Sequence, residues 1–350
     1  MRIRTCWHYC AAAPYDLSPE VPLWGDIVRN PSRQPRLLDQ VRLACQRRHY
    51  SPRTAQNYVY WARQYILFHN KRHPREMGRL ELERYLNHLA AERRVSASTQ
   101  SQALNALVFL YKHVLEIEPG WMENLERAKR KRFLPVVLTV QEVAAVRAQL
   151  GGATRLMADL IYGTGLRVME CMQLRVKDID FGSRLITVRA GKGGKDRTTL
   201  LPHELERPLQ RHLLQVATQH KRSIARGGGY APLPFALVRK YPNAARSWKW
   251  QFVFPSSVER DDPNTGCPTR WHASPSTLQR AFRDAVSAAG ITKHATVHTL
   301  RHCFATHLLQ QGCDIRTIQT LMGHRHLETT MIYTHVLAPP GNVQSPLDTL

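Results

Sequence analysis

The stretch Leu185-Ile-Thr-Val-Arg-Ala-Gly-Lys-Gly-Gly-Lys-Asp-Arg-Thr-Thr-Leu-Leu201 interrupts a chain whose apolar residues otherwise recur at helical spacing. Its two ends, 185–189 and 197–201, are short runs rich in β-branched and aliphatic residues, and the segment between them contains three glycines. Two such runs joined by a glycine-rich loop predict a β-hairpin. We therefore expect a small antiparallel sheet inside a mainly helical region.

Helical patterns flank this hairpin on both sides. Upstream, Thr139 and Glu142 have the spacing of a capping box, and the helix through 155–162 is expected to end at Gly163-Thr-Gly165. Downstream, apolar spacing predicts a long helix over 203–226 and further helices near 275–289, 297–311, 314–322 and 329–337. We assign all of these elements to one domain, 138–350.

A second helical region precedes this domain. Ser51 is expected to cap a helix that has Pro52 in its first turn, and further helices are expected to begin near Arg79 and near Ser98 or Thr99. A basic stretch at 127–137 that contains Pro135 is typical of a linker. The sequence thus predicts an irregular extension at 1–33, a helical domain at 34–126, a linker at 127–137 and the larger domain at 138–350.

Charge points to the class of partner. The 350 residues include 50 Lys and Arg against 27 Asp and Glu, which gives a formal net charge of +23 spread over the whole chain. Such a surplus favours a polyanionic partner, with a merely basic enzyme as the alternative. No apolar run is long enough to span a membrane. Seven cysteines without regular spacing indicate a reducing compartment rather than a disulfide framework.

Side chains suited to phosphodiester chemistry recur in the larger domain. They are Arg167 with Glu170, Lys192 at the hairpin tip, His298 with Arg301, His324 and Tyr333. Arginine forks bind the non-bridging oxygens of a phosphodiester, histidine and lysine donate or accept protons, and a tyrosine can attack phosphorus. Taken singly, each has an ordinary alternative as a surface ion pair, an exposed turn or a packing residue.

Two other kinds of site are disfavoured. The glycine-rich hairpin tip is not a phosphate-binding P-loop, because Lys195 is followed by Asp196 rather than by Ser or Thr. The histidines near the end of the chain lack both the His-Glu-x-x-His pattern and paired cysteines. We therefore expect no metal site.

In this order the same residues resemble the active-site motifs of the tyrosine recombinases, site-specific DNA integrases and resolvases of the phage-integrase type. The resemblance covers roughly 37–340 and implies the tyrosine recombinase fold: mainly α, with a helical core-binding DNA domain at 34–126 and a mainly helical catalytic domain with a small antiparallel β-sheet at 138–350. It implies that Tyr333 forms a 3′-phosphotyrosyl link. Arg167, Arg301 and His324 would hold the phosphate. Lys192 would protonate the leaving 5′ oxygen and His298 would assist proton transfer at Tyr333, with Glu170 in a supporting role. No cofactor and no metal are implied.

An insertion at about 227–270 makes the interval between Lys192 and His298 longer than in Xer-type members of the family. We expect a short helix in 231–242 and a strand in 247–255, where aromatic and polar residues alternate. The insertion resembles the extra segment of integron integrases. This implies gene-cassette movement between a double-stranded attachment site and folded single-stranded cassette sites with protruding bases. Candidate DNA contacts are Lys129, Arg130, Lys131, Arg132, Arg239, Lys240, Trp248, Trp250, Trp271 and His272. The tryptophans have the alternative of being core residues.

The resemblance also implies a homotetramer on DNA, because chain tails in this family dock on a neighbouring protomer. It implies a bacterial, cytoplasmic and nucleoid-associated protein. Two further interpretations stay open at this point. One is a type IB topoisomerase, which shares the chemistry. The other is an architectural DNA-binding protein that has lost activity, although such a protein would not need Tyr333.

Overall fold

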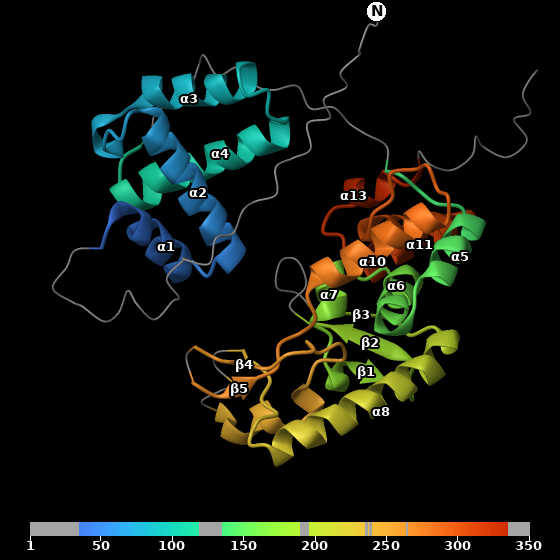
Figure 1. Cartoon of the computed structure of the whole chain (residues 1–350). Coiled ribbons are helices and arrows are strands. Elements are labelled where there is room, and N and C mark those ends of the chain that lie inside the picture. The colour runs from blue at the N-terminus through green and yellow to red at the C-terminus, as the bar shows by residue number, and fades with distance from the viewer. Residues whose placement is uncertain are drawn as a thin grey trace, which may run out of the picture. The chain divides into compact units, whose positions relative to one another are not determined.

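The computed structural model describes residues 35–118, 135–189, 196–234, 237, 240–263 and 265–334 (Figure 1). The chain divides into two compact units, Met1–Arg132 and Phe133–Leu350. Among the residues assigned from sequence, Lys192, Arg239 and the basic stretch 129–132 lie outside the described ranges. No helix in those ranges is both long enough and apolar enough to cross a membrane. The roles assigned to the four parts of the chain stay predictions.

The amino-terminal unit is a bundle of helices. They are α1 (Leu37–Arg47), α2 (Pro52–Phe68), α3 (Arg79–Ala91) and α4 (Ala97–Leu110), with a π-helical turn at Tyr111–Leu115 and a 3₁₀ turn at Pro74–Glu76. As predicted, Ser51 caps α2, because its Oγ accepts a hydrogen bond from the Thr54 amide at 3.1 Å. In the buried interior, the Tyr65 and Tyr111 hydroxyls lie 2.9 Å apart and tie α2 to the end of α4.

The carboxy-terminal unit is also mainly helical. Its helices are α5 (Val140–Gln149), α6 (Gly152–Thr164), α7 (Val168–Met172), α8 (His203–Ala225), α10 (Pro275–Ala288), α11 (Val297–Gln310), α12 (Ile315–Met322) and α13 (Glu328–Met331). The predicted hairpin is confirmed as β2 (Leu185–Val188) paired antiparallel with β3 (Arg197–Leu200), in a register that sets Thr187 opposite Thr198. A short strand β1 (Ile179–Asp180) adds a third member to the sheet. The predicted fold class, mainly α with a small antiparallel sheet, is confirmed.

Helix α6 lies at the centre of this unit. Figure 1 shows α10 and α11 on one side of it and the sheet and α8 on the other, and α6 packs against α8, α10 and α11. Leu160 and Ile161 of α6 and Leu300 and Cys303 of α11 belong to one fully buried apolar cluster. The helix ends at Gly165, whose φ of +67° is a left-handed conformation that glycine adopts without strain.

The inserted region differs from the prediction. The strand expected in 247–255 is wrong: Trp248–Trp250 is a 3₁₀ turn that follows a second one at Pro242–Arg246. The Trp250 amide bonds the Ser247 carbonyl within this turn, and the buried Gln251 side-chain amide donates to the carbonyls of Gly229 and Ala245. Beyond the turn, Phe252 and Pro255 make only isolated antiparallel bridges, to Arg175 and His272. The described strands here are instead β4 (Arg260–Asp261) and β5 (Pro268–Thr269). Of the short helix expected in 231–242, only Leu237 and Lys240 are described as helical.

The Gly165 position generates a stability prediction. A Cβ at Gly165 would lie 2.5 Å from the Phe304 ring, whereas a Cβ at Gly227, where φ is +85°, meets nothing within 4 Å. We expect Gly165→Ala to lower the free energy of unfolding by roughly 2–5 kcal/mol, and Gly227→Ala by only the backbone strain of roughly 1–2 kcal/mol. Urea denaturation of both variants measures the difference, and equal losses would contradict the packing account.

Candidate active site

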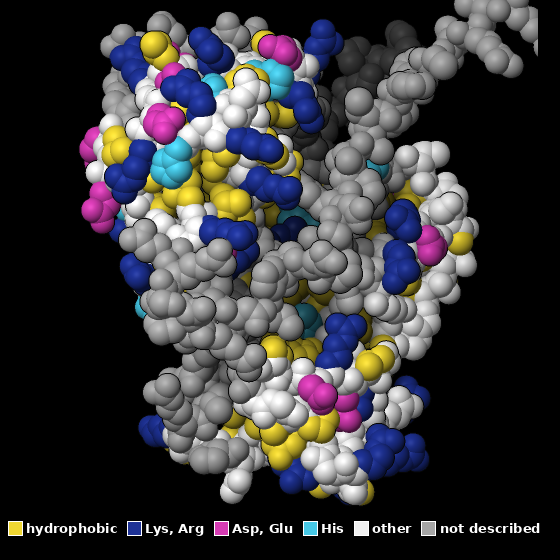
Figure 2. Space-filling model, turned by 60° about the vertical axis from the view of Figure 1, so that its left-hand side comes forward, with side chains coloured by type: hydrophobic (Ala, Val, Ile, Leu, Met, Phe, Trp, Pro, Cys, Tyr) yellow, Lys and Arg dark blue, Asp and Glu magenta, His cyan; other side chains and the backbone are white. Residues whose placement is uncertain are grey.

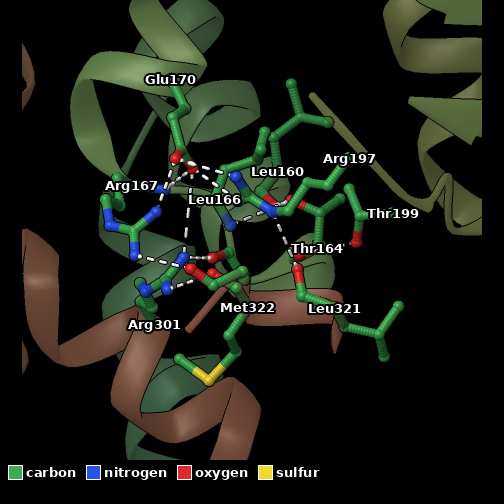
Figure 3. A network of polar contacts seen from close by, with 12 residues as sticks. Leu160, Thr164, Leu166, Arg167, Glu170, Arg197, Thr199, Arg301, Leu321 and Met322 are labelled. Atoms are coloured by element: carbon green, nitrogen blue, oxygen red, sulfur yellow. Dashed lines mark hydrogen bonds and ion pairs between the residues drawn. The ribbon is translucent and has the colours of Figure 1, made fainter. Parts of the chain in front are cut away.

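A buried carboxylate organises the site (Figure 3). Glu170 accepts two hydrogen bonds from the Arg197 guanidinium, at 2.9 and 2.6 Å, and one from Arg167 Nη1 at 2.7 Å. It also accepts the Arg167 amide at 2.9 Å, because Arg167 is the N-cap of α7 and Glu170 its third residue. Arg167 and Glu170, which the sequence analysis placed on one helix face, thus form a local ion pair. Arg197 of the sheet joins this pair as a third member.

The same contacts set the charge of this carboxylate. Burial alone would raise the pKa of Glu170, but the hydrogen bonds from Arg197 and Arg167 outweigh it and lower the pKa to about 2. Glu170 therefore carries a full negative charge at neutral pH. That charge compensates the guanidinium groups gathered around it.

A third arginine, Arg301, is held almost wholly inside the unit. Arg301 of α11 is 2% exposed and donates to the carbonyls of Gly165, where α6 ends, and of Met322, where α12 ends, the latter at 2.6 Å. Its Nη1 lies 4.0 Å from the Glu170 carboxylate. Burial and the nearby Arg167 lower the pKa of Arg301 to about 9, which leaves the guanidinium charged at neutral pH.

Arg197 is a site residue that the sequence analysis missed. It begins β3, forms the bidentate pair with Glu170, and donates through Nε to the Leu321 carbonyl at 3.1 Å. It also packs on Gly323, where an added Cβ would lie 2.7 Å from the Arg197 Cδ. No motif marks it in the sequence. The only signal is its position just after the hairpin tip that carries Lys192.

Tyr333 lies beside two histidines. Its side chain is 2% exposed, and its hydroxyl lies 3.0 Å from Nδ1 of His302. The His324 ring is nearly parallel to the tyrosine ring, with centroids 6.3 Å apart and planes 13° apart. His324 Nδ1 in turn bonds the Thr330 hydroxyl at 2.9 Å. Tyr333 thus joins α11 and the end of α12 within a single chain.

His298 reaches this group through a ring contact. It packs edge to face against His302 with centroids 4.8 Å apart, one helical turn away on α11. His302 itself was not assigned from the sequence. The available signal is its place directly after Arg301 in His298-Thr-Leu-Arg-His302, where it follows His298 by four residues.

Burial and neighbouring cations govern the protonation of this group. Burial, with the charges of Arg301 and Arg167, lowers the pKa of His324 to about 4 and also lowers the pKa of His298. Burial raises the pKa of Tyr333 to about 12, although the same arginines act against this rise. At neutral pH the histidines are therefore uncharged and the phenol keeps its proton. An anion bound near the arginines would raise the histidine pKa values.

The assigned insertion residues do not all lie together. Trp250, Trp271 and His272 line a cavity of about 700 Å³ that also has Arg167 in its wall. Trp248 lies apart from it and packs against His220, with ring centroids 5.9 Å apart. Lys240 is exposed and sits over the Tyr241 ring at 5.5 Å.

Basic side chains cover one aromatic wall of this cavity. Lys177 Nζ lies 4.0 Å from the centre of the Trp250 ring, and the Arg175 guanidinium lies 4.5 Å from the centre of the Phe252 ring. Trp271 is 44% exposed and the His272 ring packs edge to face against Phe252. The cavity thus combines aromatic planes with cations. In the described ranges, no three His, Cys, Asp or Glu side chains are grouped so as to hold a metal ion.

Comparison with known proteins extends over both units. Residues 137–338 match the model of the phage integrase family, and residues 37–121 match the phage integrase N-terminal SAM-like domain. A protein of Escherichia coli named Integrase/recombinase is 49% identical over 321 residues, which are 91% of this chain and 95% of that protein. The tyrosine recombinase XerA of Pyrococcus furiosus is 34% identical over 68% of this chain and 71% of its own length.

Solved structures share the fold. A XerH site-specific recombinase bound to a palindromic difH substrate has a TM-score of 0.57 at 20% identity, over 85% of this chain and 81% of that one. A lambda integrase dimer bound to a COC′ core site has a TM-score of 0.57 at 17% identity, over 88% and 96% of the two chains. The family matches and the relatives together show that this chain belongs to the phage integrase family and is a site-specific tyrosine recombinase.

Proposed function

We propose that the group around Tyr333 cleaves and rejoins DNA through a 3′-phosphotyrosyl intermediate. The observation that carries this proposal is that Tyr333 lies among His302, His324 and the buried guanidinium of Arg301 in its own chain. The Tyr333 Oη bonds to phosphorus while the bond to the 5′ oxygen breaks, and Lys192 supplies the proton that this oxygen takes. The new ester retains a phosphodiester linkage, so rejoining needs no cofactor and no metal.

The electrostatics of the site support this role. A phosphoryl centre under attack gains negative charge, which fixed cations stabilise without having to reorganise. Arg301 is fixed by two backbone carbonyls, and Arg167 by Glu170. The Arg167 side chain is 25% exposed, so it reaches solvent beside the buried set. On the face shown in Figure 2, Lys and Arg side chains are widely spread and Asp and Glu are few, which suits a phosphate backbone.

Loss of the Tyr333 hydroxyl tests the cleavage proposal. With a nicked suicide substrate that traps the covalent complex, we expect the wild-type band to form equally well in EDTA and to be absent in Tyr333→Phe, because the nucleophilic oxygen is gone. Tyr162→Phe is a matched control, since the Tyr162 hydroxyl also bonds a histidine of α11, His307, at 2.9 Å. We expect this control to form the band. A band from Tyr333→Phe would refute the proposed nucleophile.

The role of Glu170 is to hold the arginines, and it predicts a pH dependence. Its folded-state pKa of about 2 lies below the usual 4.5, so the stability that its charge contributes is present above pH 4.5 and is lost as the pH falls toward 2. From pH 5 to pH 3 the wild type should lose about 2 kcal/mol more unfolding free energy than Glu170→Gln. Urea denaturation at both pH values measures this.

A control variant separates the effect of Glu170 on the arginines of the site from its effect on the stability of the fold. Glu142 caps α5 and pairs with Lys293 at 2.7 Å, and the pKa of Glu142 is also lowered, but it does not contact the arginines of the site. Glu142→Gln should keep wild-type cleavage when folded, whereas Glu170→Gln should cleave slowly. Equal cleavage by the two variants would show that Glu170 does not position Arg167 and Arg197.

We propose further that the enzyme is of the integron type. Its substrates would be a double-stranded attachment site and a folded single-stranded cassette site, bound by a homotetramer that moves gene cassettes. The support is the cavity of about 700 Å³ beside Arg167, whose aromatic wall combines Trp250 and Phe252 of the insertion with Trp271 just after it. An aromatic plane that stacks an extruded base contributes about 1–3 kcal/mol. Trp271, with its exposed ring, is better placed for this than Trp250, which Lys177 covers, or Trp248, which packs against His220.

Binding measurements with two DNA forms test the integron proposal. Trp271→Ala should weaken binding to a folded cassette strand by roughly 5- to 150-fold, because about 1–3 kcal/mol of stacking is lost. Binding to the same sequence as a duplex should not change, and Trp271→Phe should keep most of the affinity for the folded strand. Equal losses on both DNA forms would refute base recognition by Trp271.

A further inference from the structure

The hydrogen-bond partner of the Tyr333 hydroxyl is a histidine outside the set assigned from sequence. In the described ranges, this hydroxyl bonds Nδ1 of His302 at 3.0 Å. His324 offers the tyrosine its ring face, and its Nδ1 is engaged with Thr330. His298 contacts the ring of His302. Of the three histidines, His302 is therefore the one in position to exchange a proton with the tyrosine oxygen.

The two protonation states allow the phenol to be the donor of this hydrogen bond. Burial, together with His298 and Arg301, lowers the pKa of His302 to about 4, so its ring is neutral at pH 7. Burial keeps the proton on Tyr333. A neutral ring with its hydrogen on Nε2 presents a lone pair at Nδ1, and the phenol then donates to it.

We propose that His302 is a catalytic residue that accepts the phenolic proton as Tyr333 attacks phosphorus. This rests on the proposed function, in which Tyr333 is the nucleophile. An oxygen lone pair of Tyr333 forms the bond to phosphorus, and its proton moves to Nδ1 of His302. The bond between phosphorus and the 5′ oxygen breaks, and its electron pair leaves with that oxygen, which takes a proton from Lys192.

The surroundings of His302 make this transfer depend on bound DNA. Burial, and in addition the neighbouring His298 and Arg301, disfavour an imidazolium here in the absence of an anion, so the ring is a weak base in the free protein. The bound phosphate and the negative charge that grows on it during attack offset this repulsion. In the rejoining step the same proton returns from His302 to the tyrosine oxygen as that oxygen leaves phosphorus.

Two substitutions separate a proton acceptor from a residue that only holds the tyrosine. Asparagine places its Oδ1 close to the position of the histidine Nδ1, so His302→Asn keeps an acceptor for the hydroxyl but cannot take its proton. His302→Ala removes both functions. We expect both variants to form the covalent complex roughly 10²- to 10⁴-fold more slowly than wild type in single turnover, with unchanged affinity for DNA.

The outcomes distinguish the two proposals. Wild-type cleavage by His302→Asn, with slow cleavage by His302→Ala, would show that His302 only positions the tyrosine and would overturn this inference alone. A covalent band from Tyr333→Phe would instead overturn the proposed nucleophile. A 5′-phosphorothiolate substrate, whose sulfur leaves without a proton, should restore cleavage to Lys192→Ala but not to His302→Asn.

A measurement on the unaltered active site covers the case in which a variant does not fold. Nitrogen NMR of the histidine-labelled full-length protein at neutral pH reports which ring nitrogen carries hydrogen, and the shift change in Tyr333→Phe identifies the His302 signals. We expect hydrogen on Nε2. Hydrogen on Nδ1 would mean that His302 donates to the tyrosine oxygen, and the inference would be refuted.

Discussion

The pairing of the Glu170 carboxylate with Arg167 and Arg197 is the interaction on which the site depends. Three guanidinium groups, including Arg301, converge on a small volume of the carboxy-terminal unit, and like charges at such range repel strongly away from bulk water. One buried carboxylate offsets this repulsion and fixes two of the three side chains by direct hydrogen bonds. Desolvation opposes such a buried network, and its value for the site lies in the geometry that it specifies.

Backbone carbonyls at two helix ends hold the third guanidinium group, that of Arg301. Arg301 donates to carbonyls at the carboxyl ends of α6 and α12, where backbone dipoles carry partial negative charge. Both helices end at a glycine with positive φ, Gly165 and Gly323, and both glycines leave no room for a side chain. The small residues are therefore as important to the site as the charged ones. They let two helix ends approach buried guanidinium groups closely enough to bind them.

The sequence predicted the parts of the structure that depend on local rules. The caps at Ser51 and Thr139 and the long helix α8 need only neighbouring residues, and each appears as expected. The pairing of Arg167 with Glu170 is local in the same sense. The assigned catalytic roles stay predictions, and Lys192 lies outside the described ranges. Arg197 and His302 escaped notice because their partners, Glu170 and Tyr333, are distant in sequence. The strand expected in 247–255 failed because the alternation of side chains does not reveal that 248–250 turn as a 3₁₀ helix and that Phe252 and Pro255 make only isolated bridges.

The bond between His324 and Thr330 has a mechanical consequence. Thr330 belongs to α13, the short helix that leads into Tyr333, so one segment carries the tyrosine hydroxyl and also holds the His324 imidazole by a hydrogen bond. A displacement of α13 cannot move Tyr333 and leave the hydrogen bond between His324 and Thr330 in place. Displacement of this single turn of helix therefore moves the Tyr333 hydroxyl and removes the hydrogen bond that holds His324, and the return of the helix restores both.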